Sequence, residues 1–463
     1  MQGIKIVRRP NWQRHIQEHA YQADVLSDRH QEYWVEALPQ PFAIQFTKAE
    51  ESAIATATEA LASMCIEFLD WFFTDQELGE VDRRLARLKI PQAYWQALKY
   101  SWERTEPTED LSLCNRFDLA LTDTGEVKLL EINAETPLLG AETVYQWNWY
   151  VDYRQNHQQS KYPLPSDAEQ FNEYWEMVAG QWRRIAKDYE LLKTGISFLV
   201  DEELAEDLEM ASQLIQILHD EVDERIYTQI VYLRGLKGES VRSCWFPAKS
   251  NWRGCDRGDE IQRGIGLDDE GYFIDHASDR IAVLWKIYDW LDLENDLSNC
   301  GLTDTLAHRL EQGDTKVIEP LWKQILANKG AMALMWSQFQ NSSYGQYLLA
   351  TYFEDDLSAE CTKLVLGMHV KKPLTGAEGV AVSIELGGSQ LAQRDALGYG
   401  ANGFIVQEYV KLPEAFGYHY MIGSWEINGE AAGMILRGDK SLITGRNCLI
   451  IPHIISDAGL YIP

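Results

Sequence analysis

Two pairs of polar residues lie within a short stretch of the sequence, at spacings that place each pair on one face of a strand. Arg116 and Asp118 form one pair, and Glu131 and Asn133 form the other. Side chains in a strand alternate between faces with a period of two, and the Thr-Asp-Thr-Gly segment 122–125 predicts a turn that folds the two strands together. The four polar groups are therefore expected to converge.

These residue types suit a site that binds a metal ion and a phosphate group. Carboxylate and carboxamide oxygens are the ligands that Mg²⁺ takes in proteins, and the ion also bridges to phosphate oxygens. An arginine beside them can bind an anion through two hydrogen bonds. An ordinary hairpin with one solvated face produces the same alternation, so the pattern by itself leaves both interpretations open.

The last third of the sequence holds further candidates for phosphate binding. Lys372 precedes Gly376 and Gly379, and a lysine supplies a compact positive charge while glycines let the backbone approach a ligand. The order of these residues is not that of a Walker A loop. Arg437 lies where a predicted strand meets a Gly-Asp turn, and it either projects into the site or pairs with Asp439 at the surface.

The elements expected to position these groups change in type along the chain. Apolar residues at three-to-four spacing predict helices over 53–73, 92–103 and 321–338. The segments 195–200, 201–219 and 225–232 predict a parallel strand, helix and strand unit, with its sheet open. Further strands are predicted over 380–386 and 404–411, and the Asn428-Gly429 turn predicts a hairpin of 421–427 with 430–437.

Composition narrows the class of protein. The chain has 463 residues, of which 45% are hydrophobic, enough for one or two packed cores. A formal net charge of −29 makes nucleic acid an improbable partner and favours cationic ones, although it also fits an acidic protein that is merely soluble. The charged beginning of the chain predicts a cytoplasmic protein without membrane contact. The seven cysteines contain no C-x-x-C pair and receive no role, and the oligomeric state stays unknown.

Together, the motifs resemble the synthetase domain of glutathionylspermidine synthases and their stand-alone homologues. They appear in that family's order: RPNW at 9–12, RFD at 116–118, LLEINAETP at 129–137, EPLWKQILANK at 319–329, VKKPLTGAEG at 370–379, QEYVKLP at 407–413, IGSWEINGEAAG at 422–433 and LRGDKSLIT at 436–444. The resemblance implies an ATP-grasp-type ligase of α/β and α+β class with a pre-ATP-grasp-like α/β portion. The metal carboxylates come before the ATP lysines, which is the family's permuted order.

The resemblance also assigns roles to individual residues. It implies Mg²⁺ ligands at Asp118, Glu131 and Asn133. It implies ATP contacts at Lys329, Lys372, Gly376, Gly379, Gln407, Glu408 and Tyr409. It implies catalytic arginines at Arg116 and Arg437, and substrate contacts at Thr136, Glu206 and Asp207. The implied organisation is a helical scaffold over 1–110, an α/β part with the metal hairpin and a substrate segment over 111–315, and an ATP-binding α+β part over 316–463.

The implied activity is ATP-dependent joining of a carboxylate to an amine through an acylphosphate, with ATP and Mg²⁺ as cofactors. The expected substrates are glutathione or a similar peptide and a polyamine such as spermidine. A ligase for another acid and amine, and a non-catalytic nucleotide-binding protein, are the alternatives. The sequence departs from the family's pattern because it has no amidase domain, because Thr136 stands where serine is frequent, and because Leu138 replaces a second serine.

Overall fold

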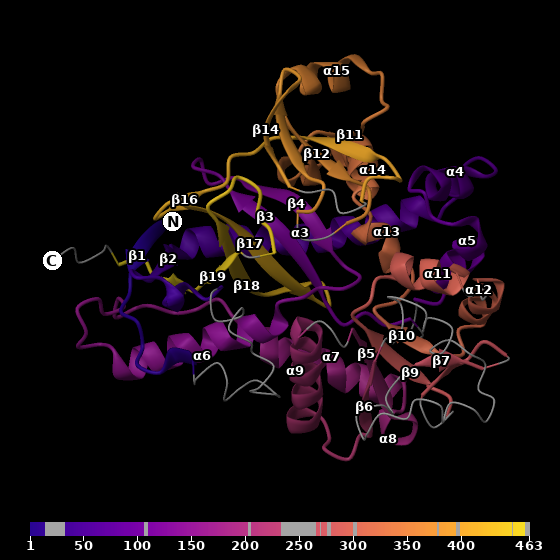
Figure 1. Ribbon diagram of the computed structural model, residues 1–463, viewed down its shortest axis with the longest axis horizontal. Coiled ribbons are helices and arrows are strands. Elements are labelled where there is room, and N and C mark those ends of the chain that lie inside the picture. The colour runs from indigo at the N-terminus through magenta and orange to yellow at the C-terminus, as the bar shows by residue number, and fades with distance from the viewer. Residues whose placement is uncertain are drawn as a thin grey trace.

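The fold combines helices with several separate sheets (Figure 1). The computed structural model describes residues 1–13, 33–105, 110–201, 205–232, 265–268, 270–275, 279–299, 303–376, 379–394, 399–446 and 448–458. The mixture of parallel and antiparallel sheets agrees with the predicted α/β and α+β class.

A six-stranded antiparallel sheet forms the centre of the molecule and contains the predicted hairpin. Its strands run in the order β19-β18-β17-β3-β4, with β16 paired to β17. Their bounds are β3 Asn115–Leu121, β4 Val127–Asn133, β16 Glu414–Ala415, β17 Tyr418–Ile427, β18 Glu430–Asp439 and β19 Leu449–Ile451. Both predicted hairpins are confirmed, and they lie side by side because β3 pairs with β17.

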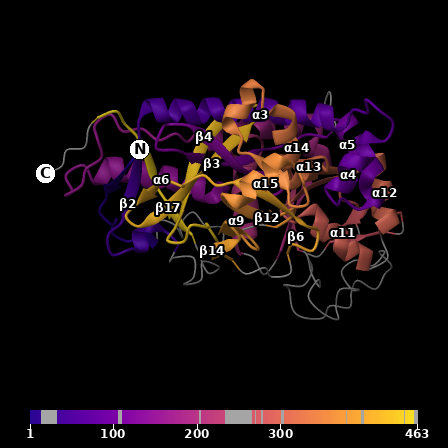
Figure 2. The same ribbon diagram turned by 90° about the horizontal axis from the view of Figure 1, so that it is seen from above.

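Helices cover both faces of this central sheet. Ser424 of β17 bonds at 2.7 Å to Thr58 of α3 (Lys48–Phe72), whereas the neighbouring Trp425 donates at 2.8 Å to Thr143 of α6 (Gly140–Asn156). Neighbouring residues in a strand point to opposite faces, so α3 lies on one face and α6 on the other. Figure 2 shows α3 along one side of the strands. Among the described residues, α3 is the one helix long and apolar enough to span a membrane, but its buried face packs on this sheet.

A four-stranded parallel sheet confirms the predicted strand, helix and strand unit. Its order is β10-β9-β5-β6. The bounds are β5 Ile196–Val200, β6 Thr228–Tyr232, β9 Val283–Lys286 and β10 Lys316–Ile318, and the connecting helix is α9 Ala205–Glu221. Figure 1 places this sheet below and to the right of the central one.

A five-stranded antiparallel sheet carries Lys372 and forms the upper part of Figure 1. Its order is β11-β15-β12-β13-β14, and all neighbours are antiparallel. The bounds are β11 Thr351–Phe353, β12 Met368–Pro373, β13 Ser383–Leu386, β14 Ser389–Gln393 and β15 Phe404–Glu408. The helices α14 (Gly330–Phe339) and α15 (Ala359–Leu366) pack against it.

The remaining elements complete the layers. A three-stranded sheet contains β1 Gln2–Lys5, β2 Phe42–Phe46 and β20 His453–Ile455, and a two-stranded one contains β7 Gly266–Leu267 and β8 Phe273–Ile274. The other helices are η1 Val35–Ala37, α4 Glu80–Arg87, η2 Gln92–Tyr94, α5 Trp95–Glu103, α7 Tyr174–Asp188, α8 Leu191–Thr194, α11 Trp290–Asn299, α12 Thr303–Gln312, α13 Lys323–Ala327 and η4 Ser343–Tyr347.

The helix predicted over 321–338 is instead two helices, α13 and α14. Asn328 ends α13 in an extended conformation, and its side chain is bonded on both sides. Its amide nitrogen donates to the Leu88 carbonyl at 2.9 Å, and its amide oxygen accepts from the Gly330 N–H at 2.9 Å. These contacts interrupt the helix and hold Lys329 at the break.

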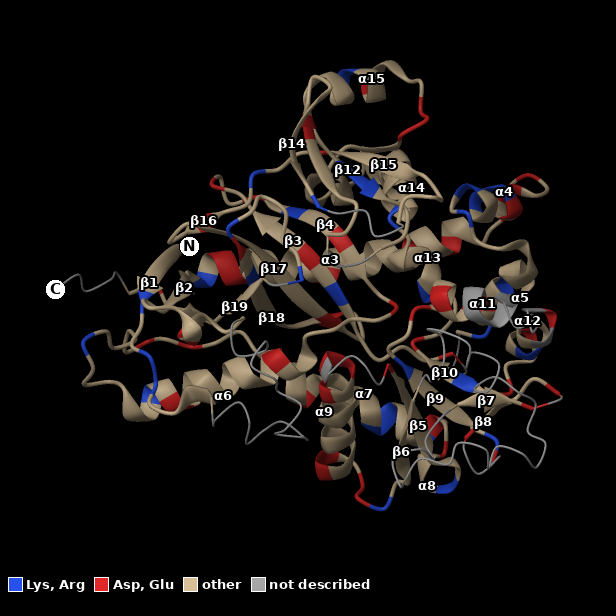
Figure 3. Cartoon of the chain, in the orientation of Figure 1, with Lys and Arg blue, Asp and Glu red and all other residues tan. Residues whose placement is uncertain are grey.

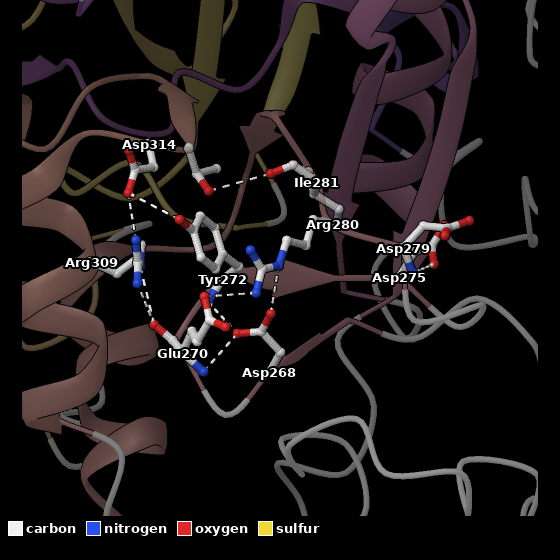
Figure 4. Close-up of polar contacts among 10 residues, drawn as sticks. Asp268, Glu270, Tyr272, Asp275, Asp279, Arg280, Ile281, Arg309 and Asp314 are labelled. Carbon is white, nitrogen blue, oxygen red and sulfur yellow. Dashed lines mark hydrogen bonds and ion pairs between the residues drawn. The ribbon is translucent and has the colours of Figure 1, made fainter.

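A network of charges and one aromatic ring fixes the β7–β8 hairpin against α12 (Figure 4). Tyr272 lies between two guanidinium groups, with Arg280 at 3.8 Å and Arg309 at 3.7 Å from the ring centroid. Arg280 also pairs with Asp268 at 2.7 Å, while Arg309 pairs with Asp314. Every member of this group is already paired within it, so the network is structural.

Candidate active site

The predicted hairpin gathers its four polar residues as alternation requires. Asp118 lies opposite Glu131 in the pairing of β3 with β4, and Arg116 lies opposite Asn133. The Arg116 Nε donates to Asp118 Oδ1 at 3.0 Å, and the Asn133 Nδ2 donates to Asp118 Oδ2 at 3.1 Å. The structure therefore brings these residues together on one face, with Asp118 at the centre.

Arg437 reaches the same carboxylate from the second hairpin. Its guanidinium donates to Asp118 Oδ2 and is mostly buried, which excludes the alternative of a surface pair with Asp439. Asp439 pairs with Arg394 instead. The Arg437 Nε is buried and has no hydrogen-bond partner among the described residues. A buried guanidinium donor without a partner is available to an anion.

The two arginines keep Asp118 ionised. Burial acts to raise the pKa of Asp118, but Arg116 and Arg437 together outweigh it and hold the pKa at about 2. The side chain is nearly inaccessible, so this balance depends on the two ion pairs rather than on water. Asp118 therefore fixes both arginines in place at neutral pH.

Gly423 makes room for this arrangement and is a residue that the sequence analysis did not single out. It lies between Asp118 and Ile435 in the sheet, on β17. A Cβ atom at this position would lie 2.9 Å from the Arg116 Cδ and 3.0 Å from an Ile435 methyl carbon. Any larger residue would displace the Arg116 side chain. The Gly-Ser-Trp sequence alone offered no signal for this role.

Lys329 links the hairpin to the glycine loop. Its Nζ lies 3.4 Å from Glu131 Oε1 and also donates to the Gly376 carbonyl. Its backbone N–H donates to the Leu374 carbonyl at 2.8 Å. Gly376 has a φ of 140° and Gly379 a φ of 72°, conformations that favour glycine. Residues 377 and 378 of the predicted loop lie outside the described residues.

Lys372 is buried between the two antiparallel sheets. Its Nζ donates to Gln407 Oε1 at 2.7 Å and to the Leu130 carbonyl at 2.8 Å. Burial lowers the pKa of Lys372, and the positive charge of Lys329 lowers it further, whereas the negative charge of Glu131 acts to raise it. The resulting pKa is about 8. In Figure 3, basic residues of β12 appear beside acidic residues of β3 and β4.

The structure places Gln407, Glu408 and Tyr409, three of the predicted ATP contacts, at the end of β15. The Gln407 side chain is used by Lys372 and by Thr351, whose Oγ1 accepts from Gln407 Nε2 at 3.2 Å. The Glu408 N–H donates to the Ala350 carbonyl at 2.8 Å, and its side chain is exposed. Tyr409 follows the strand and is half-buried. The assignment of these three residues to ATP remains a prediction.

A cavity open to solvent joins several of these residues, with an empty volume of about 800 Å³ that includes its open mouth. Residues from three of the predicted groups line it, namely Glu131, Asn133, Thr136, Lys329 and Gly376. Asp118, Arg437 and Lys372 lie behind this lining and support it through the contacts described above. Some of the predicted metal, phosphate and substrate residues therefore meet at one cavity.

The predicted acidic pair on α9 lies apart from the lining. Asp207 is only 4% exposed, and its Oδ2 accepts from the Asp201 N–H at 3.2 Å. Burial raises the pKa of Asp207 to about 8, with contributions from Asp201, Glu206 and Asp289. Thr136, in contrast, donates to Asp289 Oδ1 at 2.9 Å within the cavity wall.

The donor set of the hairpin fits a hard cation. Glu131 and Asn133 line the cavity, and because Asn133 donates its amide nitrogen to Asp118, its oxygen stays available for a ligand. The described residues contain no group of three His, Cys, Asp or Glu side chains placed for a metal, and the predicted set has only two carboxylates and one amide. Glu131 and Asn133 would hold Mg²⁺ through oxygen, as the ion prefers. Asp118, the third predicted ligand, does not line the cavity and has both oxygens bonded to Arg116, Asn133 and Arg437, so its role as a ligand stays a prediction.

A buried ion pair beside the cavity was missed in the sequence analysis. Lys286 Nζ lies 3.1 Å from Glu135 Oε1, and both side chains are buried. Burial raises the pKa of Glu135 to about 7, against the opposing charge of Lys286. The signal available in the sequence was a lysine inside the apolar run 281–287. A lysine in a buried strand predicts a nearby acid.

The chain is similar to several known proteins along most of its length. The family profile described as "Glutathionylspermidine synthase preATP-grasp" matches residues 3–232 and 254–456. A Haemophilus influenzae protein named as a proposed acid–amine ligase is 27% identical over 91% of this chain and 90% of its own length. The bifunctional glutathionylspermidine synthetase/amidase of Escherichia coli is 23% identical over 88% of this chain and 58% of its own length.

A solved structure extends the likeness to the fold. The glutathione synthetase-like effector GSS30 from Globodera pallida, in its apo form, superposes with a TM-score of 0.51 at 12% sequence identity. The match covers 96% of both chains. At this identity the comparison concerns the fold alone.

Proposed function

The chain belongs to the glutathionylspermidine synthase pre-ATP-grasp family, and on that premise we propose that it is an ATP-dependent acid–amine ligase. The proposed acid is glutathione or a similar small peptide, and the proposed amine is a polyamine such as spermidine. The similarity to an enzyme named glutathionylspermidine synthetase/amidase supports this choice. The match spans about three fifths of that enzyme's length, so its substrates come to this chain only by proposal.

One observation carries the proposal: two arginines and two lysines surround the hairpin whose Glu131 and Asn133 line the cavity. Arg437 has a buried Nε without a partner, and Lys329 and Lys372 place positive charge on the other side of Glu131. Two anions brought together need positive charge held in a fixed position. A protein that only bound a nucleotide would not need Arg116 and Arg437 on a shared carboxylate.

In the first step, a carboxylate oxygen of the peptide attacks the γ-phosphorus of ATP. A new P–O bond forms, the bond to the β,γ-bridging oxygen breaks, and ADP leaves with that electron pair. Lys329 and Lys372 offset the charge of the phosphates, and Arg437 binds an oxygen of the transferred group. Mg²⁺, when bound, would neutralise phosphate charge further. The product of the step is an acylphosphate.

In the second step, the neutral amine adds to the acylphosphate carbonyl. The C–N bond forms, the C–O bond to phosphate breaks, inorganic phosphate leaves and the amine proton passes to phosphate or water. Arg437 stabilises the oxyanion that develops at the carbonyl, because a guanidinium held by Asp118 requires no reorganisation as charge appears. The products are an amide, ADP and phosphate.

Phosphate release is the experiment that tests the proposal. The purified protein is supplied with ATP and Mg²⁺, and release is measured with glutathione alone, with spermidine alone and with both. We expect release to require both substrates and to match amide formation by mass spectrometry. Release that ignores both substrates would contradict a ligase.

A further inference from the structure

The segment 439–445 begins at the last residue of β18, two residues after Arg437, and packs on the five-stranded sheet. Ile443 is buried in a small hydrophobic cluster with Val382 and Ile384, which lie just before and within β13. The segment therefore joins the central sheet to the sheet that carries Lys372. The function proposed above uses Arg437 and assigns no role to the residues that follow it.

A single carboxylate folds this segment into a turn. Asp439 Oδ1 accepts from the Ser441 N–H at 2.8 Å, and Asp439 Oδ2 accepts from the Gly445 N–H at 3.2 Å. Aspartate side chains that accept nearby backbone N–H groups stabilise turns in this way. Asp439 therefore holds the two ends of the segment together.

Arg394 holds this turn from the five-stranded sheet. It directly follows β14, and its guanidinium donates to Asp439 Oδ2. It also donates to the Ile443 carbonyl, through Nε at 3.0 Å and through Nη2 at 2.6 Å. Gly445 packs against the guanidinium so closely that a Cβ atom at this position would overlap with it. These contacts of Arg394 with Asp439, Ile443 and Gly445 form a clamp.

The clamped segment contacts the end of the glycine loop that is predicted to bind ATP. A Cβ atom at Gly379 would lie 2.6 Å from the Thr444 carbonyl oxygen and 3.6 Å from the Arg394 Cδ. The Gly379 carbonyl accepts from the Val382 N–H at 3.2 Å, and the Val382 carbonyl accepts from the Arg394 N–H at 3.1 Å. The position of Gly379 therefore depends on Arg394 and on the segment that Arg394 holds.

An ordinary surface ion pair does not describe the clamp. Such a pair joins two exposed side chains and contributes little to stability. The Arg394 and Asp439 side chains are 31% and 17% exposed, and Arg394 adds two bonds to a backbone carbonyl. A planar guanidinium presents several donors in a fixed geometry, which suits the joining of two acceptors on one turn.

We propose that Arg394 is a positioning residue of the ligase. By holding the segment 439–445, it keeps Gly379 in place beside the ATP phosphates and fixes the end of β18 that carries Arg437. The proposal rests on the proposed function and deepens it. Arg394 acts through Asp439 and Ile443, so its role requires no contact of its own with ATP.

The experiment measures how the clamp affects the use of ATP. Amide formation from ATP, glutathione and spermidine is measured for the wild type, for Arg394→Ala, Arg394→Lys and Asp439→Asn, and for the double variant Arg394→Ala/Asp439→Asn. We expect Arg394→Ala to raise the KM for ATP about tenfold and to lower kcat about tenfold, because Gly379 and Arg437 lose their fixed positions.

The other variants test whether the two side chains act as a unit. Arg394→Lys keeps the charge but cannot bond to both acceptors in the same geometry, so its kcat/KM for ATP should stay at least about fivefold below that of the wild type. The double variant should be no less active than Arg394→Ala, because both substitutions break the same clamp.

Arg104 provides a matched control, because it makes the same kinds of contact and does not line the cavity. Its guanidinium donates to the Glu311 carbonyl at 2.9 Å and pairs with Asp110 at 3.5 Å. A Cβ atom at Gly313 would lie 2.8 Å from its Nε. Arg104→Ala should lower the melting temperature, as Arg394→Ala does, but should leave kcat and the KM for ATP within about twofold of the wild type.

Several outcomes would overturn the positioning role in an active ligase. One is a value of kcat and of the KM for ATP that stays within about twofold of the wild type in Arg394→Ala. A second is an equal change of both constants in Arg104→Ala, which would indicate a general loss of stability. A third is a double variant whose loss of activity is the product of the two single losses, since independent sites behave in this way.

A binding measurement separates the clamp from the reaction. If the wild type forms no amide, the proposed function fails, and calorimetric titration with ATP and Mg²⁺ then decides the role of the clamp. A Kd for ATP that Arg394→Ala and Asp439→Asn each raise about tenfold, and that Arg104→Ala leaves unchanged, supports the clamp. An unchanged Kd in the first two variants, or no binding of ATP to the wild type, overturns it.

Discussion

Replacing Arg437 by alanine separates the catalytic interpretation of this residue from a purely structural one. The substitution removes the buried guanidinium that contacts Asp118 and whose Nε has no partner. Asp118 keeps two donors, Arg116 Nε at 3.0 Å and Asn133 Nδ2 at 3.1 Å. Leaving a buried charge wholly unpaired costs about 3–5 kcal/mol, so with these partners retained we expect about 1–2 kcal/mol of destabilisation.

The expected effect on turnover is larger. Removing one preorganised oxyanion donor costs about 2.7–4 kcal/mol, which corresponds to roughly a hundredfold to a thousandfold in kcat. In steady-state assays with ATP, glutathione and spermidine, kcat and kcat/KM of Arg437→Ala should fall together, with KM for ATP nearly unchanged. Arg183→Ala is the control, because Arg183 forms an exposed pair with Glu221. Turnover of Arg437→Ala within about fivefold of the wild type would refute the role.

Three other predictions follow from the same contacts. Lys372→Ala and Lys329→Ala should each weaken ATP binding at least about tenfold in a calorimetric titration, because both lysines are assigned to phosphates. Gly423→Ala should lower kcat at least about tenfold, because its methyl group would displace Arg116. Asp207→Asn should stabilise the ligand-free protein increasingly as the pH rises from about 4 to about 8, since the pKa of Asp207 is raised by burial to about 8 in the fold. Between these pH values the folded wild type binds more protons than the unfolded chain. Its free energy of unfolding therefore falls by up to about 1.4 kcal/mol for each unit that the pH rises, and asparagine, which does not titrate, removes this dependence.

Each of these has an outcome that contradicts it. If a lysine variant is destabilised but its affinity for ATP is unchanged, that lysine makes a structural contact and does not bind phosphate. Normal turnover of Gly423→Ala would show that the reaction does not require the observed position of the Arg116 side chain. A constant difference in melting temperature between Asp207→Asn and the wild type across pH 4–8 means that Asp207 is ionised in the fold as in the unfolded chain.

The central hairpins could be predicted because their signals are local. Residues two apart share a face, and the Asn428-Gly429 turn specifies the second hairpin from two adjacent residues. The pairing of β3 with β17 brings the two hairpins together across more than half of the chain. No local signal predicts that pairing, although the family resemblance had placed both hairpins at one site.

The parts that sequence reasoning missed depend on distant contacts. The break between α13 and α14 follows from the bond of Asn328 to Leu88, which helix propensity does not register. Arg437 could be assigned to the surface or to the site until its partner was seen to be Asp118 rather than Asp439.

The nucleotide product formed during turnover tests the central claim most directly. The protein is incubated with ATP, Mg²⁺, glutathione and spermidine, and the nucleotides and the amide are quantified together. The proposed acylphosphate route predicts ADP and inorganic phosphate in equal amounts, one of each for every amide formed, and no release when either substrate is omitted. Formation of AMP and pyrophosphate, or ADP release without amide, would contradict the account.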